Sequence, residues 1–419
     1  MSRLDLTGLT ARPAQVWGGI RLVPLVRDEP VAGLRLRPEA RGAADGSGEL
    51  CDPGADGLAD EVAYIPHGLV VDWSDGPDGP GSGSDPAGPG STGSGPTAVY
   101  GTQLGGAAGE RAGRRGRGRP APPVRIPLRD HQRLVRRHRS QGSPEPRLRF
   151  LPLRLALDGY LSLHFGGPPV VWEEWTRRAV RQGLPPRSVA AYTGRQVPGL
   201  AEALRIFEIH PGQCGVLVYA ADSLAAAFAV PHPEDYRVLH PTLVEDLYGE
   251  VVHQYAFFGA PVPEFTAELG DGRHIRSLAD LRAAARGAER AWEEGHSTLM
   301  AARLLDAPYA FRRVYTLGSF TLWRFLPSFR RGEPEQHIGE TITDHKGRVA
   351  FLKTFRLSEA QTGRAYLLQR LHEHDWHLDR TAEAIGTDRA DLVRRLREAG
   401  FDELLKQGAE RHPRTPGAS

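Results

Sequence analysis

The chain has 419 residues, enough for two or three domains with cores of their own. Its formal net charge is only +2, so the overall charge does not indicate a polyanionic partner. The two cysteines are too few for a disulfide framework or a cysteine zinc site. No apolar run is long enough for a membrane span, and the N-terminus lacks the pattern of a signal peptide. These features predict a cytoplasmic protein with no membrane partner.

Arginine dominates the basic residues. Of the 53 basic residues, only Lys346, Lys353 and Lys406 are lysine. This bias, together with many Ala, Gly and Pro residues, is typical of a GC-rich coding genome, so Arg-rich patches are weaker evidence for a ligand here. The 49 Gly and 34 Pro residues also indicate long unstructured connections.

Residues 1–104 are predicted to form a small β-rich unit. Segments 16–26, 61–73 and 97–104 are rich in branched and aromatic residues and indicate strands. Residues 75–96, between the last two, consist almost entirely of Gly, Pro, Ser and Asp and cannot bury a core. We therefore expect a disordered insert within this unit.

Residues 105–145 are rich in Arg, Gly and Pro and are predicted to be a flexible linker. Between residues 111 and 139 there are eleven arginines and one acid, a local charge of +10. That charge is compatible with a nucleic-acid-binding arm. A solvated linker is the simpler interpretation, because no aromatic residue interrupts the run to stack on bases.

Residues 146–356 are predicted to form an α+β central domain that acts as a sensor or a partner-binding scaffold. Its first segment, 150–167, is compatible with a helix or a strand. Segment 172–184 is an amphipathic helix, and 204–222 indicates two strands around a Pro-Gly turn. Segments 235–258 and 278–300 have helical patterns.

Candidates for chemistry in this block are weak. Glu250 and His253 have a metal-bundle spacing, but no second copy occurs on another helix of the block. The pairs His210 with Cys214 and His232 with His240 have loose spacing, so a solvated face and turn histidines are the simpler interpretations. The chain also lacks a phosphate-binding loop, a nucleophile elbow and a zinc-protease motif. No catalytic, cofactor or metal residue is predicted, and an enzyme is the third choice.

The segment after residue 357 indicates three short helices. Ser358 and Gln361 form a capping-box pattern at the start of the first. Asp379 is predicted to cap the second helix, which ends at Gly386, and Asp388 to cap the third. In the third helix Leu392, Leu396 and Ala399 fall on one side and Ala390, Arg394 and Arg397 on the other, with Gly400 closing it.

The run from Thr381 to Gly386, followed by Leu392, Arg395, Leu396 and Gly400, resembles the Fis-type helix-turn-helix. This module binds DNA at the C-terminus of bacterial nitrogen-regulator-type activators. The resemblance implies a module over residues 357–405, before a disordered tail at 406–419. It also implies that the third helix contacts DNA through Arg389, Ala390, Asp391, Arg394 and Arg395.

Two features of the segment depart from that pattern. Asp391 occupies a position where the family usually has Thr or Asn, and its carboxylate repels phosphate. Residues 358–405 contain seven arginines and ten acids, a net charge of −3, whereas DNA-binding faces are usually basic. A packing or dimerisation module is therefore the alternative.

The rest of the chain resembles a bacterial family named for its association with ADP-ribosylglycohydrolase (ARG) and rhodanese-phosphatase-superfamily proteins. The resemblance lies in segments 11–26, 64–71 and 207–236. The resemblance implies that genes of this family occur alongside genes of those proteins. It implies no mechanism, so no catalytic residue follows from it.

Together these patterns predict an α+β protein with an all-α C-terminal module. The preferred interpretation is a bacterial transcription regulator that binds DNA as a homodimer. The alternative is a non-enzymatic accessory protein of an ADP-ribose or NAD-linked system, whose helical tail mediates association with other proteins of that system.

Overall fold

The computed structural model describes residues 2–27, 29–37, 60–63, 69–72, 97–105, 124–127, 148–150, 153–182, 199–200, 204–264, 272–333, 335–402 and 404–405. The insert expected at 75–96, the tail expected at 406–419 and most of the linker expected at 105–145 lie outside these ranges. Within them, no helix has both the length and the apolar character that crossing a membrane requires.

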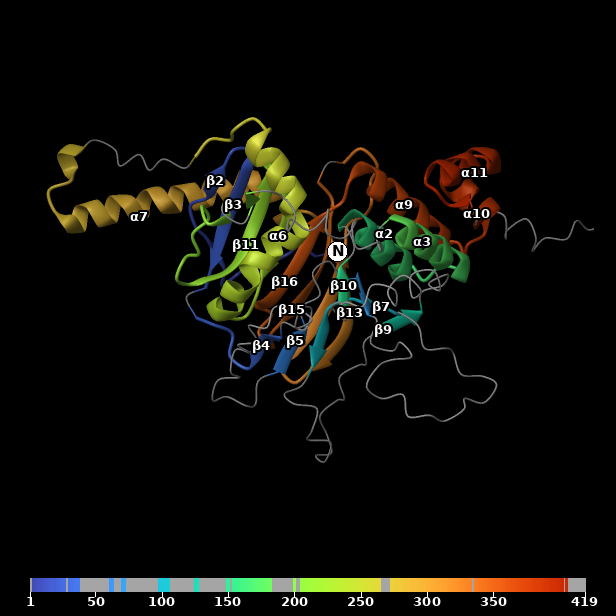
Figure 1. Ribbon diagram of the computed structural model, residues 1–419, viewed down its shortest axis with the longest axis horizontal. Helices are drawn as coiled ribbons and strands as arrows, with labels where there is room; N and C mark the ends of the chain where they lie inside the picture. Colours follow the sequence, from blue (N-terminus) through green and yellow to red (C-terminus); the bar gives the residue numbers. More distant parts are fainter. Residues whose placement is uncertain are drawn as a thin grey trace, which may run out of the picture.

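An antiparallel sheet forms the centre of the described chain (Figure 1). Its strand order is β1-β3-β11-β12-β16-β15-β14-β13, and β2 pairs with β3 beside this path. The strands are β1 (Thr10–Ala11), β2 (Gln15–Trp17), β3 (Ile20–Val26), β11 (Gln213–Ala220), β12 (Ser223–Ala229), β13 (Ala310–Leu317), β14 (Phe320–Leu326), β15 (His337–Thr343) and β16 (Val349–Arg356). The predicted strands at 16–26 are confirmed as the β2–β3 hairpin.

Both faces of this sheet are covered, so its middle strands are apolar along their length rather than alternating. β3 and β11 are buried at every position. Ile20 and Val216 belong to the hydrophobic cluster on one face, whereas Val23 and Leu217 belong to the cluster on the other. Successive residues of a strand point to opposite faces, which is why each strand contributes to both clusters.

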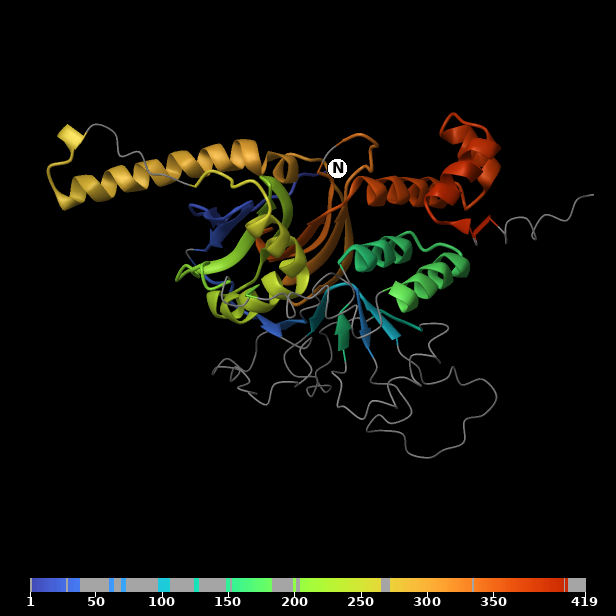
Figure 2. The ribbon, with the colours of Figure 1, turned by 45° about the horizontal axis from the view of Figure 1, so that its top comes forward.

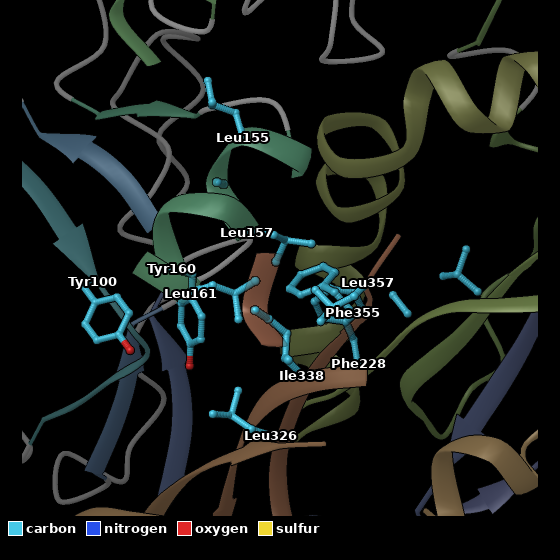
Figure 3. Close-up of a cluster of buried hydrophobic side chains, with 14 of the residues drawn as sticks. Tyr100, Leu155, Leu157, Tyr160, Leu161, Phe228, Leu326, Ile338, Phe355 and Leu357 are labelled. Carbon is cyan, nitrogen blue, oxygen red and sulfur yellow. The ribbon is translucent and has the colours of Figure 1, made fainter. Parts of the chain in front are cut away.

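The larger cluster joins the sheet to several helices. These are α2 (Leu153–His164), α3 (Pro169–Gln182), α6 (Pro233–Phe257) and α9 (Glu359–Glu373). Figure 3 shows Leu157 and Leu161 of α2 beside Ile338 and Phe355 of the sheet. Segment 150–167, which was compatible with a helix or a strand, is therefore a helix over α2.

The other cluster is covered by the N-terminal segment and by the elements between α6 and β13. The elements that reach this cluster are α7 (Leu278–Gly295), the π-helix η3 (His296–Met300) and α8 (Ala302–Leu305), whereas η2 (Gly272–His274) precedes them and has no buried residue. Only the C-terminal end of α7 reaches the cluster, through Trp292. The rest of α7 extends away from the sheet (Figure 2). The helices predicted at 172–184, 235–258 and 278–300 are confirmed as α3, α6 and α7 with η3.

Two smaller sheets complete the described strands. One has the order β10-β6-β7-β9, from β10 (Leu148–Phe150), β6 (Leu69–Asp72), β7 (Thr97–Tyr100) and β9 (Val124–Pro127). The other has the order β4-β5-β8, from β4 (Leu34–Arg37), β5 (Asp60–Ala63) and β8 (Gln103–Gly105). The strands predicted at 61–73 and 97–104 therefore occur as two short strands each.

Three details differ from the sequence-based predictions. β9 lies inside the predicted linker, because Val124 to Pro127 pair with β7. Residues 204–212 contain no strand, and β11 instead pairs with β12 across Ala221 and Asp222, whose φ angles of 49° and 56° suit a tight hairpin turn. β1–β3 share a sheet with strands beyond residue 212, so the sheets do not divide at residue 104. The fold is α+β.

A single methyl group at Gly339 should disrupt the large sheet. A Cβ there would lie 2.3 Å from the Lys353 carbonyl oxygen and 2.6 Å from Cζ of Phe325. Overpacking of this kind costs about 1–3 kcal/mol. We expect Gly339→Ala to lower the midpoint of urea unfolding accordingly. Gly363→Ala is the matched control, because a Cβ at this helical glycine meets nothing within 4 Å. An unchanged midpoint for Gly339→Ala would contradict this packing.

Candidate nucleic-acid interface

The C-terminal module, residues 357–405, consists of α9 (Glu359–Glu373), α10 (Leu378–Ala384) and α11 (Arg389–Glu398). α9 follows directly after β16 and packs against α2. Figures 1 and 2 both show α10 and α11 at the end of the molecule remote from α7, beyond the edge of the sheet. Among the described residues, Arg389, Arg394 and Arg397 on the outer side of α11 are exposed.

The capping box predicted at the start of α9 is confirmed. The Ser358 hydroxyl accepts a hydrogen bond from the Gln361 amide at 3.3 Å. In return, the Ser358 amide donates to Oε1 of Gln361 at 3.0 Å. These two bonds satisfy backbone donors that the first helical turn leaves unpaired, and so fix where α9 begins.

The predicted cap of the second helix is wrong. α10 begins at Leu378, and its N-cap is His377, whose Nδ1 accepts a hydrogen bond from the Arg380 amide at 3.4 Å. Asp379 already lies inside the helix, where its carboxylate binds Arg389. A neutral imidazole nitrogen can accept a hydrogen bond as a carboxylate does, and the extended backbone of His377 places it suitably.

The turn between α10 and α11 follows the predicted pattern. Gly386 has a φ of 68°, and its amide donates to the Glu383 carbonyl at 3.0 Å, while the Thr387 amide donates to the Ala382 carbonyl at 2.9 Å. This is a Schellman motif, which requires a left-handed residue. Asp388 then caps α11 by accepting the Asp391 amide at 2.7 Å. Both predictions, the glycine turn and the Asp388 cap, are confirmed.

The apolar side of the module is buried, as its spacing predicts. Leu392 and Leu396 are fully buried and belong to the cluster that also contains Leu368 and Leu371 of α9. Phe401 closes the end of α11 under the Arg364 guanidinium, which lies 4.5 Å from the ring centroid. The module therefore shares a hydrophobic core with the central domain and is not joined to it by a linker alone.

Each of the arginines expected at DNA is held by a carboxylate of the same module. Nη1 of Arg389 lies 3.0 Å from the Asp379 carboxylate. Arg394 binds Asp391 and, at 2.7 Å, Glu398. Arg395 lies 2.6 Å from Asp391. Ala390, the remaining expected contact besides Asp391, is exposed at the start of the helix.

Asp391 is the centre of this charge network. The Thr387 hydroxyl donates to its carboxylate at 2.7 Å, and this hydrogen bond, followed by the Arg394 and Arg395 charges, lowers the pKa of Asp391 to about 2. The carboxylate is therefore ionised at neutral pH. Asp391 lies on the helix that is expected to contact DNA phosphates. Its negative charge neutralises Arg394 and Arg395, two of the arginines expected to bind those phosphates.

A cavity of about 870 Å³ adjoins the module, between α9 and the end of α11 on one side and α2 and α3 on the other. Sequence patterns gave no sign of it, because its walls come from segments that are far apart in the chain. Its lining residues include Arg154, Asp158, Arg178, Arg331, Glu359, Gly363, Arg364, Leu367 and residues 398–400.

The other candidate residues make local contacts. His210 accepts the Gly212 amide in a turn, and His232 bonds the Val31 carbonyl at 3.0 Å. His240 bonds the Tyr236 hydroxyl at 2.6 Å. Among the described residues, no three His, Cys, Asp or Glu side chains gather as a metal site would require. The Glu250 side chain lies outside the described part.

Comparison with family models gives one match, over residues 4–318. The chain belongs to the family described as ARPP-2. The match covers most of the chain and ends within the β13–β14 hairpin, before the C-terminal module begins. Neither the curated proteins nor the solved structures yield a match to this ARPP-2 chain. An ADP-ribose-linked role and a Fis-type helix-turn-helix both stay predictions.

Proposed function

We propose that this ARPP-2 chain is a DNA-binding regulator whose C-terminal module contacts DNA through α11. The observation that supports this best is the unit formed by α10, the Gly386 turn and α11. A short helix, a left-handed turn residue and a capped second helix are the parts of a module that places its second helix in the major groove. The exposed side of that helix carries Arg389, Ala390 and Arg394.

The ion pairs on α11 do not prevent this function. Exposed pairs such as Arg394 with Glu398 contribute little to stability, because solvent and salt screen their attraction. A DNA phosphate can replace the carboxylate as the partner of the guanidinium, with counterion release from the DNA as the driving force. The pairs instead reduce the net attraction, so we expect modest affinity that falls steeply with salt.

A single module of this kind contacts one half-site, so we propose that the regulator acts as a homodimer. The α+β part, residues 2–356, would then sense a ligand or bind a partner. The competing function is that of an accessory protein whose module binds another protein, for which the carboxylate partners of all three arginines are the supporting observation.

Selection from a random duplex library by the full chain tests the proposal. The expected result is enrichment of a short sequence, with binding that weakens steeply between about 50 and 200 mM salt. Enrichment of no sequence, together with no retention of any duplex at the lower salt concentration, would favour the accessory-protein function.

Asp391→Asn should strengthen DNA binding. The change removes one negative charge beside the phosphates, frees Arg395 and leaves Arg394 with Glu398 as its remaining partner, while an amide oxygen can still accept from Thr387. We expect an increase of several-fold in affinity at 100 mM salt, measured by fluorescence anisotropy with the full chain. Glu373→Gln, on the exposed surface of α9, is the control for a general charge effect. Weaker binding by Asp391→Asn would count against α11 as the contact surface.

A further inference from the structure

The cavity beside the C-terminal module has the size and lining of a small-molecule site. Its volume of about 870 Å³ lies in the range of ligand pockets, roughly 300–1,000 Å³. α2 and α3 form one side, residues 331–333 with Glu335 and the first turns of α9 another, and residues at the end of α11 a third. Figure 1 shows these helices gathered at one end of the molecule.

Most charged side chains of the lining are already paired. Asp158 binds Arg178 at 2.7 Å and lies 4.0 Å from Arg364. Three glutamates of the lining, Glu333, Glu335 and Glu398, bind Arg330, Arg303 and Arg394 respectively. The lining as a whole holds five arginines and five acids, so the paired side chains leave no excess charge and an anion depends on the arginines that have no carboxylate partner.

Two further arginines of the lining are available to a ligand. Arg154 and Arg331 are both exposed, and no carboxylate in the described part of the chain forms an ion pair with either. The unpaired acid of the lining, Glu359, lies at the first position of α9, where the helix dipole stabilises a negative charge. Guanidinium groups at the mouth of a cavity are typical of sites that bind phosphate or carboxylate.

The first turn of α9 adds backbone donors to the same cavity. Ser358 and Gln361 satisfy part of this turn, and residues 359–363 line the cavity. α9 has 15 residues, so its N-terminus has a full helix dipole behind it. A helix start of this kind favours an anion, and it lies in the same lining as Arg154 and Arg331, whose positive charges outnumber the single Glu359 carboxylate of this turn.

Gly363 leaves space in the cavity for the apolar part of a ligand. It lies inside α9, where glycine costs about 0.5–1 kcal/mol relative to alanine. A Cβ at this position would meet nothing within 4 Å, so no protein neighbour requires the glycine. Its backbone lines the cavity together with the apolar side chains of Leu357 and Leu367. The absence of a side chain leaves room for an apolar group against the helix.

We propose that this cavity binds a small amphiphilic anion, with its phosphate or carboxylate head at Arg154, Arg331 and the first turn of α9. Its apolar body lies along Gly363 and Leu367. Since residues 398–400 form another wall, the bound ligand also restrains α11 against α9. A regulatory effect on DNA rests on the proposed function, whereas binding and restraint do not.

Calorimetric titration of the full chain with 1-naphthyl phosphate tests the binding. 1-Naphthol, which lacks the phosphate, probes binding of the apolar body alone. Inorganic phosphate probes binding of the anionic head alone. We expect 1-naphthyl phosphate to bind at least about tenfold more tightly than either. Equal affinity for inorganic phosphate and the ester would overturn the amphiphilic class, and no binding of the ester would overturn the site.

Variants locate the bound molecule. Arg154→Gln with Arg331→Gln should weaken binding at least about tenfold, whereas Arg286→Gln with Arg290→Gln on the remote helix α7 should not. Gly363→Leu should fill the path and abolish binding, while Gly363→Ala retains a folded, more stable chain as its control. Unchanged affinity in both cavity variants would overturn the proposal.

Hydrogen exchange of the full chain tests the restraint without any DNA. Saturating 1-naphthyl phosphate should slow amide exchange in residues 396–400, the end of α11 that lines the cavity. Slower exchange there supports the coupling, and unchanged exchange at saturation overturns it. Failure to bind DNA would affect neither this measurement nor the titration.

Discussion

Replacing Glu340 with alanine is expected to lower the free energy of unfolding by roughly 3–5 kcal/mol, because the change leaves a buried ammonium without its counter-charge. Glu340 and Lys353 have side chains that are 1% and 2% exposed, and their charged atoms lie 3.2 Å apart. Arg324 contacts the same carboxylate at 2.8 Å. Urea unfolding followed by circular dichroism measures the loss.

The carboxylate also fastens two remote segments to the sheet. Its Oε2 accepts the Thr102 amide at 2.7 Å, and its Oε1 accepts the Tyr160 hydroxyl at 3.1 Å. Thr102 lies between β7 and β8, and Tyr160 lies on α2. Loss of Glu340 therefore removes polar contacts with the β7–β8 connection, α2, β14 and β16 at once, which places the expected effect at the upper end for a single substitution.

The intact pair contributes less than its removal costs. Burial lowers the pKa of Lys353 even though Glu340 acts in the opposite direction, so desolvation of the ammonium opposes the attraction. A double variant, Glu340→Gln with Lys353→Met, removes both charges and should regain a large part of the stability that Glu340→Ala loses. A loss below about 1 kcal/mol for Glu340→Ala would contradict this description of the cluster.

The stability of the chain at low pH should also depend on Glu340. Burial alone would raise the pKa of Glu340, but Lys353 and Arg324 more than offset it and lower the pKa to about 2, from 4.5. A depressed folded pKa means that the contribution is complete above about 4.5 and is lost as the pH falls toward 2. Over this pH interval, the melting temperature of the wild-type chain should therefore fall further than that of the Glu340→Gln variant.

The second large effect concerns DNA. Replacing Arg394 and Arg395 together with alanine is expected to weaken DNA binding by at least about 30-fold, since each contact to a base or phosphate contributes about 1–3 kcal/mol. Both side chains lie on α11, and their partner Asp391 loses two ion pairs of small value. Fluorescence anisotropy with a labelled duplex measures the affinity, and an unchanged melting temperature excludes unfolding as the cause.

The matched control replaces Arg136 and Arg137, which belong to the Arg-rich stretch at 111–139. It removes the same charge from a different part of the chain. If α11 contacts DNA, this control should weaken binding much less than the α11 double variant. A larger loss in the control would assign the binding to the Arg-rich stretch.

Local signals explain what could be predicted from the sequence. Capping boxes, cap residues and turn glycines act within a few residues, so Ser358, Gly386 and Asp388 indicated the boundaries of the C-terminal helices. His377 was missed because histidine is an uncommon N-cap and Asp379 offered the usual chemistry two residues later. The helical patterns at 235–258 and 278–300 were long enough to be unambiguous.

Long-range features could not be predicted in this way. β3 pairs with β11 some 190 residues later, and the sequence of neither strand indicates which strand it pairs with. The cluster at Glu340 and the cavity beside α11 likewise draw on residues from distant segments. The order of strands in the sheet depends on the total burial that each pairing achieves, which no local pattern records.

The salt dependence of DNA binding by the full chain tests the central claim most directly. The logarithm of the affinity should fall linearly with the logarithm of the salt concentration, and the slope should become shallower by about 2 in the Arg394→Ala, Arg395→Ala variant. An identical slope in wild type and variant, or no binding at low salt, would contradict the proposal that α11 contacts DNA.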